Sequence, residues 1–248
     1  MFNLKLDDPV LLKKVIAVLS DFITEATFNI NKDGLKLMAM DPANICMVSL
    51  QILPSAFSEY EVENKEDITL NLGLLQQALS RAKSNEIVHL TLSENRLVLS
   101  ITGKSAKKYF IPLLEKEEKE RKAPELEFSS KIELNANELK DYVEDASVVG
   151  DAVTFESVPG KLTISAGETA SRVRIDLLKD SEAVIKMDVK DTARAIYSID
   201  YLKKLAKSSS LADSVLLQYS SDYPIQLDFK SLNKLKMQFI LAPRIENR

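Results

Sequence analysis

The stretch that decides the fold is TFNINKDGLKLMAM, residues 27–40. Apolar and polar side chains alternate on both sides of its centre, as they do in strands that pack one face on a core. At the centre, Lys32, Asp33 and Gly34 have the composition of a turn between neighbouring strands. The stretch therefore predicts an antiparallel hairpin.

The second half of the chain repeats this pattern at an offset of about 127 residues. Runs at 153–156 and 161–165 alternate in the same way around a Pro-Gly turn, and Phe28 matches Phe155. Apolar residues continue to match at similar offsets from the first strand-like run to the last. This internal repetition predicts two copies of one fold.

Other parts of the chain show either the strand period or the helix period. Strand-like alternation also covers 46–52, 87–92, 96–101, 107–113, 172–178, 214–219, 225–229 and 235–241. Helical spacing, with apolar side chains on one face, occurs near 10–21, 73–83, 136–146 and 200–207. Each half is therefore predicted to be an α+β domain with antiparallel sheets and two short helices.

A charged segment at 115–126 separates the two predicted domains, 1–114 and 127–248. It has almost no apolar side chains and contains Pro124 near its end, which fits a solvated connector. A helix is the alternative, because Glu and Lys at this spacing favour one locally. Such a helix would be marginal, since it has no apolar face to bury.

Composition excludes several classes of protein. Of the 248 residues 45% are hydrophobic, the formal net charge is −4, and no apolar run is long enough to span a membrane. The N-terminus does not have the pattern of a signal peptide. We therefore expect a soluble intracellular protein with one large domain or two small ones and no membrane contact.

Motifs for catalysis, nucleotide binding and metal binding are missing from the sequence. The single cysteine, Cys46, excludes an intrachain disulfide and a cysteine-rich metal site, and the single histidine, His89, lies in a strand-like run. Residues 103–105 resemble the end of a phosphate-binding loop, but Val98 stands where that loop requires glycine. We expect no enzyme activity, no metal and no cofactor, with a hydrolase or transferase as the alternative.

The four predicted helices bring basic side chains together. Their segments carry eight basic residues against six acidic ones, although the whole chain is acidic. A basic face of this kind could bind a polyanion such as a nucleic-acid backbone. The alternative is that lysine is simply common on exposed helix faces. The basic residues are Lys13, Lys14, Arg81, Lys83, Lys140, Lys203, Lys204 and Lys207.

Several segments resemble proliferating cell nuclear antigen, the sliding DNA clamp. The C-terminal LAPRIE, residues 241–246, is similar to the family's Leu-Ala-Pro-Lys-Ile-Glu ending, and 2–6 followed by 11–15 is similar to its opening. Residues 38–45 resemble the segment before the family's third strand, and 147–153 the segment after its third helix. The similarity runs in order along the chain, diverges only in the connector, and looks more like the archaeal branch than the eukaryotic one.

The resemblance implies a DNA-clamp fold, in which each of two similar domains is a duplicated β-α-β-β-β unit. Antiparallel sheets would form the outside and four helices would line a ring of three chains. Such a ring is not an enzyme but a processivity factor in DNA replication and repair, and it encircles double-stranded DNA without sequence preference. A clamp loader would place it on DNA, and short hydrophobic peptides would tether DNA polymerase, flap endonuclease and DNA ligase. The expected location is cytoplasmic and nucleoid-associated in an archaeon, or nuclear in a eukaryote.

The resemblance also implies three sets of site residues. The eight basic helix residues would face DNA, although Asp141 and Glu144 of the third helix stand where many relatives are basic. Partner peptides would contact Met40, Asn44, Ile45, Met47, Leu126, Pro224, Ala242, Pro243 and Ile245. Subunits would meet through Lys108, Tyr109, Phe110 and Ile111 of one chain and Arg172, Val173, Arg174 and Ile175 of the next.

Two other functions stay open at this point. The acidic third helix would also suit a subunit specialised for a mixed ring of sister chains. A two-domain scaffold that binds proteins and no DNA would fit the same pattern of strands and helices.

Overall fold

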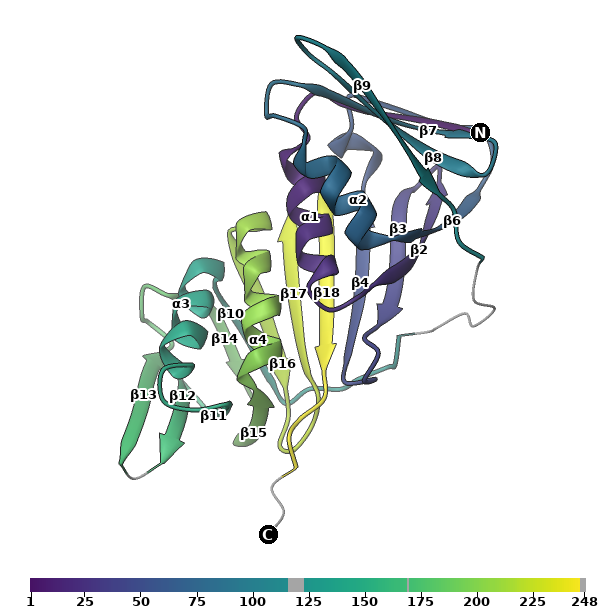
Figure 1. Cartoon of the computed structure of the whole chain (residues 1–248). Helices are drawn as coiled ribbons and strands as arrows, with labels where there is room; N and C mark the ends of the chain where they lie inside the picture. The colour runs from purple at the N-terminus through teal and green to yellow at the C-terminus, as the bar shows by residue number, and fades with distance from the viewer. Residues whose placement is uncertain (116–122, 169, 246–248) are drawn as a thin grey trace. The chain divides into compact units, whose positions relative to one another are not determined.

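The computed structural model describes residues 1–115, 123–168 and 170–245, and these form two compact units (Figure 1). Much of the connector that the sequence predicts, 116–122, lies outside the described residues. The predicted domain boundaries therefore stay a prediction. Unit 1 consists of Met1–Pro42, Val48–Ala123 and Ser231–Lys236, and unit 2 of Ala43–Met47, Pro124–Lys230 and Met237–Arg248.

The first half of the chain supplies nine strands and two helices, α1 (Val10–Ser20) and α2 (Leu72–Ser80). One antiparallel sheet has the order β5-β1-β7-β8-β9, and the strands β6-β2-β3-β4 run side by side in another. A short 3-10 turn covers Pro54–Ala56. The strands are β1 (Phe2–Leu6), β2 (Glu25–Asn31), β3 (Gly34–Met40), β4 (Cys46–Ile52), β5 (Glu59–Val62), β6 (Glu66–Asn71), β7 (Ile87–Ser93), β8 (Arg96–Thr102) and β9 (Ala106–Pro112).

The second half of the chain repeats this order of elements, with α3 (Ala136–Ala146) and α4 (Ile199–Ala206) as its helices. Its sheets have the orders β13-β12-β11-β15 and β14-β10-β16-β17-β18. A 3-10 turn at Lys207–Leu211 follows α4. The strands are β10 (Ser130–Asn135), β11 (Ala152–Val158), β12 (Lys161–Glu168), β13 (Ser171–Leu178), β14 (Val184–Val189), β15 (Ala193–Ser198), β16 (Ser214–Tyr219), β17 (Ile225–Ser231) and β18 (Leu235–Leu241). The repeated order confirms the predicted duplication and the α+β class.

The hairpin that the sequence predicts at 27–40 is formed by β2 and β3, with Phe28 opposite Leu37. Its counterpart in unit 2 pairs β11 with β12 and sets Phe155 opposite Ile164. Both phenylalanines are buried, which follows from the alternation that sends every second side chain into the core. The local pattern was therefore sufficient to predict both hairpins and their inward faces.

The helices pack one face against the sheets, and α2 and α3 begin at asparagine caps. The Asn71 side chain accepts the N–H of Leu74 at 3.0 Å at the start of α2, and Asn135 accepts the N–H of Asn137 at 3.0 Å at the start of α3. Asparagine is favoured at this position because it satisfies a backbone N–H that the helix leaves unpaired. These caps fix where α2 and α3 begin on their sheets.

The structure differs from the sequence prediction mainly at short strands. The strand period did not predict β5, β6, β10, β14 or β15. β5 is a four-residue strand, Glu-Tyr-Glu-Val, that presents its charged residues to solvent, while β15 is buried at most positions and so shows no alternation. The predicted second helix was also too long, because α2 ends at Ser80 and residues 81–83 form the turn beyond it.

Candidate functional site

In unit 1, α1 and α2 lie side by side and antiparallel (Figure 1). The hydroxyl of Ser20 at the end of α1 donates to the carbonyl of Leu72 at the start of α2 at 3.5 Å. At the other end, the ammonium of Lys13 donates to the carbonyl of Ala82, just beyond α2, at 2.6 Å. This end of the helix pair gathers four predicted DNA-facing residues, Lys13, Lys14, Arg81 and Lys83.

Lys13 has a structural role at this end of the pair. Its Nζ lies 2.6 Å from the carbonyl oxygen of Ala82 and 3.5 Å from that of Ser80, and its side chain is half-buried. The last carbonyls of a helix have no partner within it, and a cation there also offsets the helix dipole. Lys13 thus caps α2, whereas the exposed Lys14, Arg81 and Lys83 can reach a phosphate backbone.

Glu86 orders the turn that carries Lys83, although only 7% of Glu86 is exposed. One carboxylate oxygen accepts the Lys83 N–H at 2.9 Å, and the other lies 3.6 Å from the Nζ of Lys107 on β9. The hydrogen bond from Lys83, with the nearby charge of Lys107, holds the pKa of Glu86 below its ordinary value. A charged Glu86 therefore fixes the backbone of Lys83 while the Lys83 side chain stays exposed.

In unit 2, α3 and α4 also pack side by side, but their cations are engaged within the unit (Figure 1). The Nζ of Lys203 on α4 donates to the hydroxyl of Ser147, just beyond α3, at 3.3 Å. Lys140 lies 3.4 Å from the carboxylate of Glu144 on the same helix. The ammonium of Lys204 lies 5.6 Å from the centre of the Tyr201 ring, also on α4. These three contacts reduce the charge that α3 and α4 offer to a ligand.

The two helix pairs consequently differ in charge. Around α1 and α2, residues 10–21 and 72–83 carry four basic residues and one acidic residue, a net charge of +3. Around α3 and α4, residues 136–146 and 199–207 carry four basic and five acidic residues, a net charge of −1. The positive charge that could attract a polyanion is therefore concentrated on the α1/α2 pair.

The predicted partner-peptide residues all belong to unit 2, except for Met40, which belongs to unit 1. The N–H of Ala242 donates to the carbonyl of Ile45 at 2.9 Å. Ile45 is 38% exposed and Ile245 is 87% exposed, so both offer apolar surface. Met47 is only 8% exposed and can contribute no more than the floor of a site. Asn44 is exposed, and Leu126, Pro224, Ala242 and Pro243 are half-buried.

β15 holds two of these segments along its outer edge. The N–H of Arg244 donates to the carbonyl of Ile196 on β15 at 2.7 Å, and the N–H of Asp222 donates to Arg194 on the same strand at 3.0 Å. Asp222 begins the turn that leads to Pro224. An edge strand needs such cover, because its outer N–H and C=O groups are otherwise unpaired. Covering β15 therefore brings the C-terminal segment and the turn at 221–224 to one strand.

The predicted subunit contacts lie on two other edge strands. β9 is the last strand of its sheet, and β13 is the last strand of the sheet β13-β12-β11-β15. Phe110 on β9 is 56% exposed, whereas Ile111 packs in the core of its own unit and is 4% exposed. Beside β9, a groove of about 460 Å³ is lined by residues that include Leu74, Ala78 and Tyr109. Lys108, Arg172 and Arg174 are exposed, and Tyr109, Val173 and Ile175 are half-buried.

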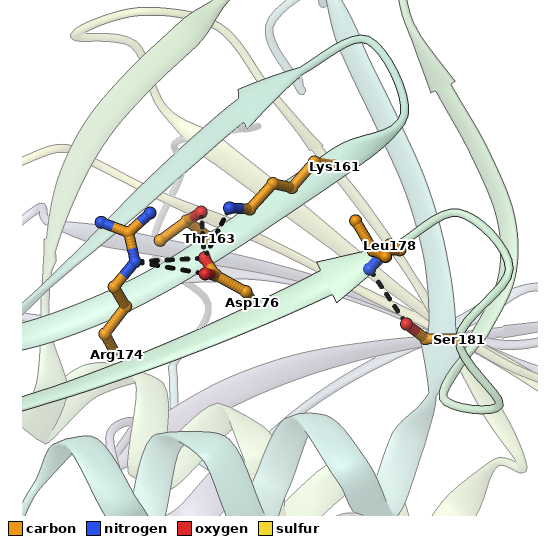
Figure 2. Close-up of polar contacts among 6 residues, drawn as sticks. All are labelled: Lys161, Thr163, Arg174, Asp176, Leu178 and Ser181. Atoms are coloured by element: carbon orange, nitrogen blue, oxygen red, sulfur yellow. Dashed lines mark hydrogen bonds and ion pairs between the residues drawn. The ribbon is translucent and has the colours of Figure 1, made fainter.

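On β13, Asp176 holds together the polar side chains of the outer face (Figure 2). Its Oδ1 accepts the hydroxyl of Thr163 at 2.7 Å and lies 3.1 Å from the Nζ of Lys161 and 3.2 Å from the Nε of Arg174. The Thr163 hydrogen bond and then Lys161 and Arg174 lower the pKa of Asp176 to about 2. The carboxylate therefore stays charged above its ordinary pKa of 3.8, and its favourable contacts are lost only as pH falls towards 2.

The end of β13 is closed by a polar contact of its own, the Leu178 N–H donating to the Ser181 hydroxyl at 2.9 Å (Figure 2). In the part of the chain that the structure describes, no helix is long and apolar enough to cross a membrane. Among these same residues, no cluster of three or more His, Cys, Asp or Glu side chains could hold a metal ion.

Sequence reasoning missed three residues that shape these surfaces: Glu86, Asp151 and Arg244. Arg244 lies in the C-terminal segment that carried the resemblance, but its ion-pair partner Asp151 is 93 positions away in sequence. Glu86 follows the predicted second helix, and nothing in the neighbouring sequence distinguishes it from the many glutamates that would be expected on the surface. Only the folded chain shows that its carboxylate is buried.

Known proteins with similar sequences cover nearly the whole chain. Two family models match it, proliferating cell nuclear antigen, N-terminal domain, over residues 1–116 and the C-terminal domain over residues 122–245. A DNA polymerase sliding clamp from Nanoarchaeum equitans is 38% identical over 237 residues, covering 94% of this chain and 95% of that protein. One from Thermococcus gammatolerans is 34% identical over 233 residues, covering 94% of each.

A solved structure has the same fold. Proliferating cell nuclear antigen from Thermococcus kodakaraensis superposes with a TM-score of 0.91 at 29% identity, covering 98% of this chain and 100% of that one. The resemblance inferred from the segments and the clamp fold are both confirmed. The chain belongs to the proliferating cell nuclear antigen family of DNA polymerase sliding clamps.

Proposed function

We propose that three copies of this DNA polymerase sliding clamp close into a ring around duplex DNA, and that the α1/α2 pair makes most of the phosphate contacts. The observation that carries this proposal is the net charge of +3 on residues 10–21 and 72–83, in a chain whose formal net charge is −4. Contacts to phosphates carry no sequence information, so they permit sliding while the ring prevents escape. Lys14, Arg81 and Lys83 make these contacts.

The edges of β9 and β13 support ring closure. Each is the outermost strand of its sheet, and they have seven and eight residues. Strands of matching length with unpaired edges can join head to tail, one from each chain, and three such joints close a ring. The exposed Phe110 and Leu74 beside β9 add apolar surface that a neighbouring copy would bury.

The surface around the C-terminal segment is the proposed docking site for client proteins. Exposed Ile45 and Ile245, with half-buried Leu126, Pro224 and Pro243, offer apolar contacts to a short peptide with aliphatic or aromatic anchors. The proposed clients are DNA polymerase, flap endonuclease and DNA ligase. A separate clamp loader supplies the ATP-driven opening, since the sequence has no nucleotide-binding motif.

Retention on circular DNA tests the proposal. The protein is loaded onto a nicked circular duplex by a clamp loader with ATP, and half of the sample is then linearised. Bound protein is measured by gel filtration over a salt series. We expect retention on the circle and release from the linear form. We also expect the triple variant Lys14→Ala, Arg81→Ala, Lys83→Ala to make the negative slope of log K against log salt shallower. The change is about two to three, roughly one per phosphate contact.

A matched variant makes the result specific. Lys179→Ala, Lys190→Ala, Lys230→Ala removes the same charge from exposed lysines outside the helices, and we expect it to leave the slope unchanged. Light scattering on both triple variants checks that they assemble as the unmodified chain does. Equal retention on circular and linear DNA would contradict encirclement. Equal loss of slope in both triple variants would contradict the α1/α2 pair as the DNA face.

A further inference from the structure

Three polar contacts are described between the C-terminal segment, residues 242–245, and the rest of unit 2, and one of them is an ion pair. The Nη1 of Arg244 lies 2.9 Å from the Oδ2 of Asp151. The other described contacts are the N–H of Ala242 to Ile45 and the N–H of Arg244 to Ile196. These two N–H groups are two residues apart and bond to different segments of unit 2, Ile45 just before β4 and Ile196 on β15.

The main chain of Asp151 is held in place by the neighbouring elements of unit 2. It directly precedes β11, and its carbonyl accepts the N–H of Ile199, the first residue of α4, at 3.0 Å. Ile196, which receives the Arg244 N–H, lies opposite Thr154 in the β11–β15 pairing. Arg244 therefore joins β15 through its main chain and reaches past it to the start of β11 through its side chain.

We propose that Asp151 and Arg244 form a latch that positions the C-terminal segment for partner peptides, an inference that rests on the docking surface proposed above. Asp151 and Arg244 are positioning residues, and neither needs to touch the peptide. Docking of Ala242 and Arg244 leaves the Ile245 side chain 87% exposed, next to the half-buried Pro243. The latch thus presents these two apolar residues to the peptide.

The expected effect is on local order rather than on the stability of the fold. The Asp151 and Arg244 side chains are 80% and 44% exposed, and exposed ion pairs contribute little to global stability. A terminal segment for which three polar contacts are described nevertheless depends on each of them, because it can detach without unfolding the unit. If detachment lowers the docked fraction, the apparent peptide affinity falls by the same factor.

Neutral and charge-swapped variants test the latch. The probe is a fluorescein-labelled 12-residue synthetic peptide with one aliphatic and two adjacent aromatic anchors, and binding is followed by anisotropy. We expect Asp151→Asn and Arg244→Gln each to weaken binding about three- to fivefold, the upper range of an exposed ion pair. Arg244→Lys is expected to keep most of the affinity of the unmodified chain. The double variant Asp151→Arg, Arg244→Asp is expected to regain most of the affinity that either neutral variant loses. Asp180→Asn, which removes an exposed charge from the turn after β13, leaves it unchanged.

Two further readouts separate positioning from a structural effect. Hydrogen exchange of the Arg244 amide, measured without peptide, is expected to quicken in the neutral variants, while their melting temperature shifts by less than about 3 °C. At about 1 M salt the unmodified chain and the neutral variants converge in affinity, because the ion pair is screened.

The outcomes distinguish this inference from the docking surface it rests on. If the unmodified chain does not bind the peptide, the proposed docking surface is wrong, and the exchange of the Arg244 amide still tests the latch. If the unmodified chain and the neutral variants bind equally well, the latch is wrong and the docking surface stands. A charge swap as weak as the single variants would also overturn the latch.

Discussion

At the residue scale, Gly34 and Gly160 show how equivalent turns in the two halves meet different surroundings. Both have positive φ, 127° and 86°, in the region that favours glycine. A Cβ on Gly34 would lie 2.3 Å from the carbonyl oxygen of Ile52, whereas a Cβ on Gly160 would have no atom within 4 Å. Glycine is therefore required at position 34 by both the positive φ and the close carbonyl of Ile52, and at position 160 by the positive φ alone.

Alanine at each position separates these reasons. We expect Gly160→Ala to lower the free energy of unfolding by about 1 kcal/mol, from the positive φ alone. Gly34→Ala is expected to cost more, about 3 kcal/mol or above, because the backbone carbonyl of Ile52 cannot move away without disturbing β4. Urea denaturation of both variants provides the measurement. Equal midpoints would contradict the steric contribution at Gly34.

At the element scale, the end of the α1/α2 pair combines a structural cation with three exposed ones. Lys13 donates to carbonyls at the end of α2 and just beyond it, and Lys14, one position later, is exposed. Adjacent residues on a helix point about 100° apart, so two neighbouring lysines can serve different purposes. The sequence assigned both to DNA, and only the packing of α1 on α2 separates them.

Substitution of each lysine by methionine tests this division. Lys13→Met is expected to lower the free energy of unfolding by about 1 kcal/mol, because the carbonyls at the end of α2 lose their cation. Lys14→Met is expected to change stability by less than about 0.5 kcal/mol but to weaken DNA retention more than Lys13→Met does. The measurements are urea denaturation and the salt-dependent retention assay. The reverse order of effects would contradict the capping role.

At the scale of the whole molecule, ring closure depends on how strongly the charges on β9 of one copy and β13 of the next repel each other. β9 carries Lys107 and Lys108, and β13 carries Arg172 and Arg174 with one aspartate. Asp176 engages Arg174, and Glu86 lies near Lys107, so two of these four cations already have a partner within the chain. The two edges can therefore meet with less repulsion than their composition suggests.

Light scattering over a concentration series measures the assembly. We expect the mass of a trimer, about three times the 27.8 kDa of the chain. Phe110→Glu is expected to shift the protein towards monomer, because it puts a charge into the apolar part of the edge. Leu232→Glu is the control, since Leu232 is 87% exposed on the β17–β18 turn and belongs to neither edge strand.

A monomer that persists at high concentration would contradict a ring of identical chains. It would favour the mixed ring of sister subunits instead, which the cations on both edges and the acidic α3 also suit. Adding a sister chain with acidic edge strands would then be expected to restore a trimer mass. Loss of the trimer in both Phe110→Glu and Leu232→Glu would show that the effect is not specific to β9.

Parts of the candidate site were predictable because their signals are local. Lys14, Arg81 and Lys83 were predicted to face DNA from their places on helical segments, and the structure leaves their side chains exposed, as such a contact requires. Lys13 was also predicted to face DNA, but it caps a helix, and Met47 was predicted to contact partner peptides, but it is buried. A residue's sequence neighbours show which face of its own helix or strand it occupies, and they do not show what packs against that face.

The sequence by itself determined the duplication, the α+β class and the absence of enzyme motifs, because hydrophobic period, turn residues and motif spacing are properties of neighbouring residues. The tertiary structure alone decided that Lys13 caps α2, that Glu86 orders the turn at Lys83, and that Arg244 pairs with Asp151. Lys13 and Arg244 reach atoms 69 and 93 positions away along the chain. Contacts at such separations arise when packed helices and strands bring distant residues together, and no local pattern encodes them.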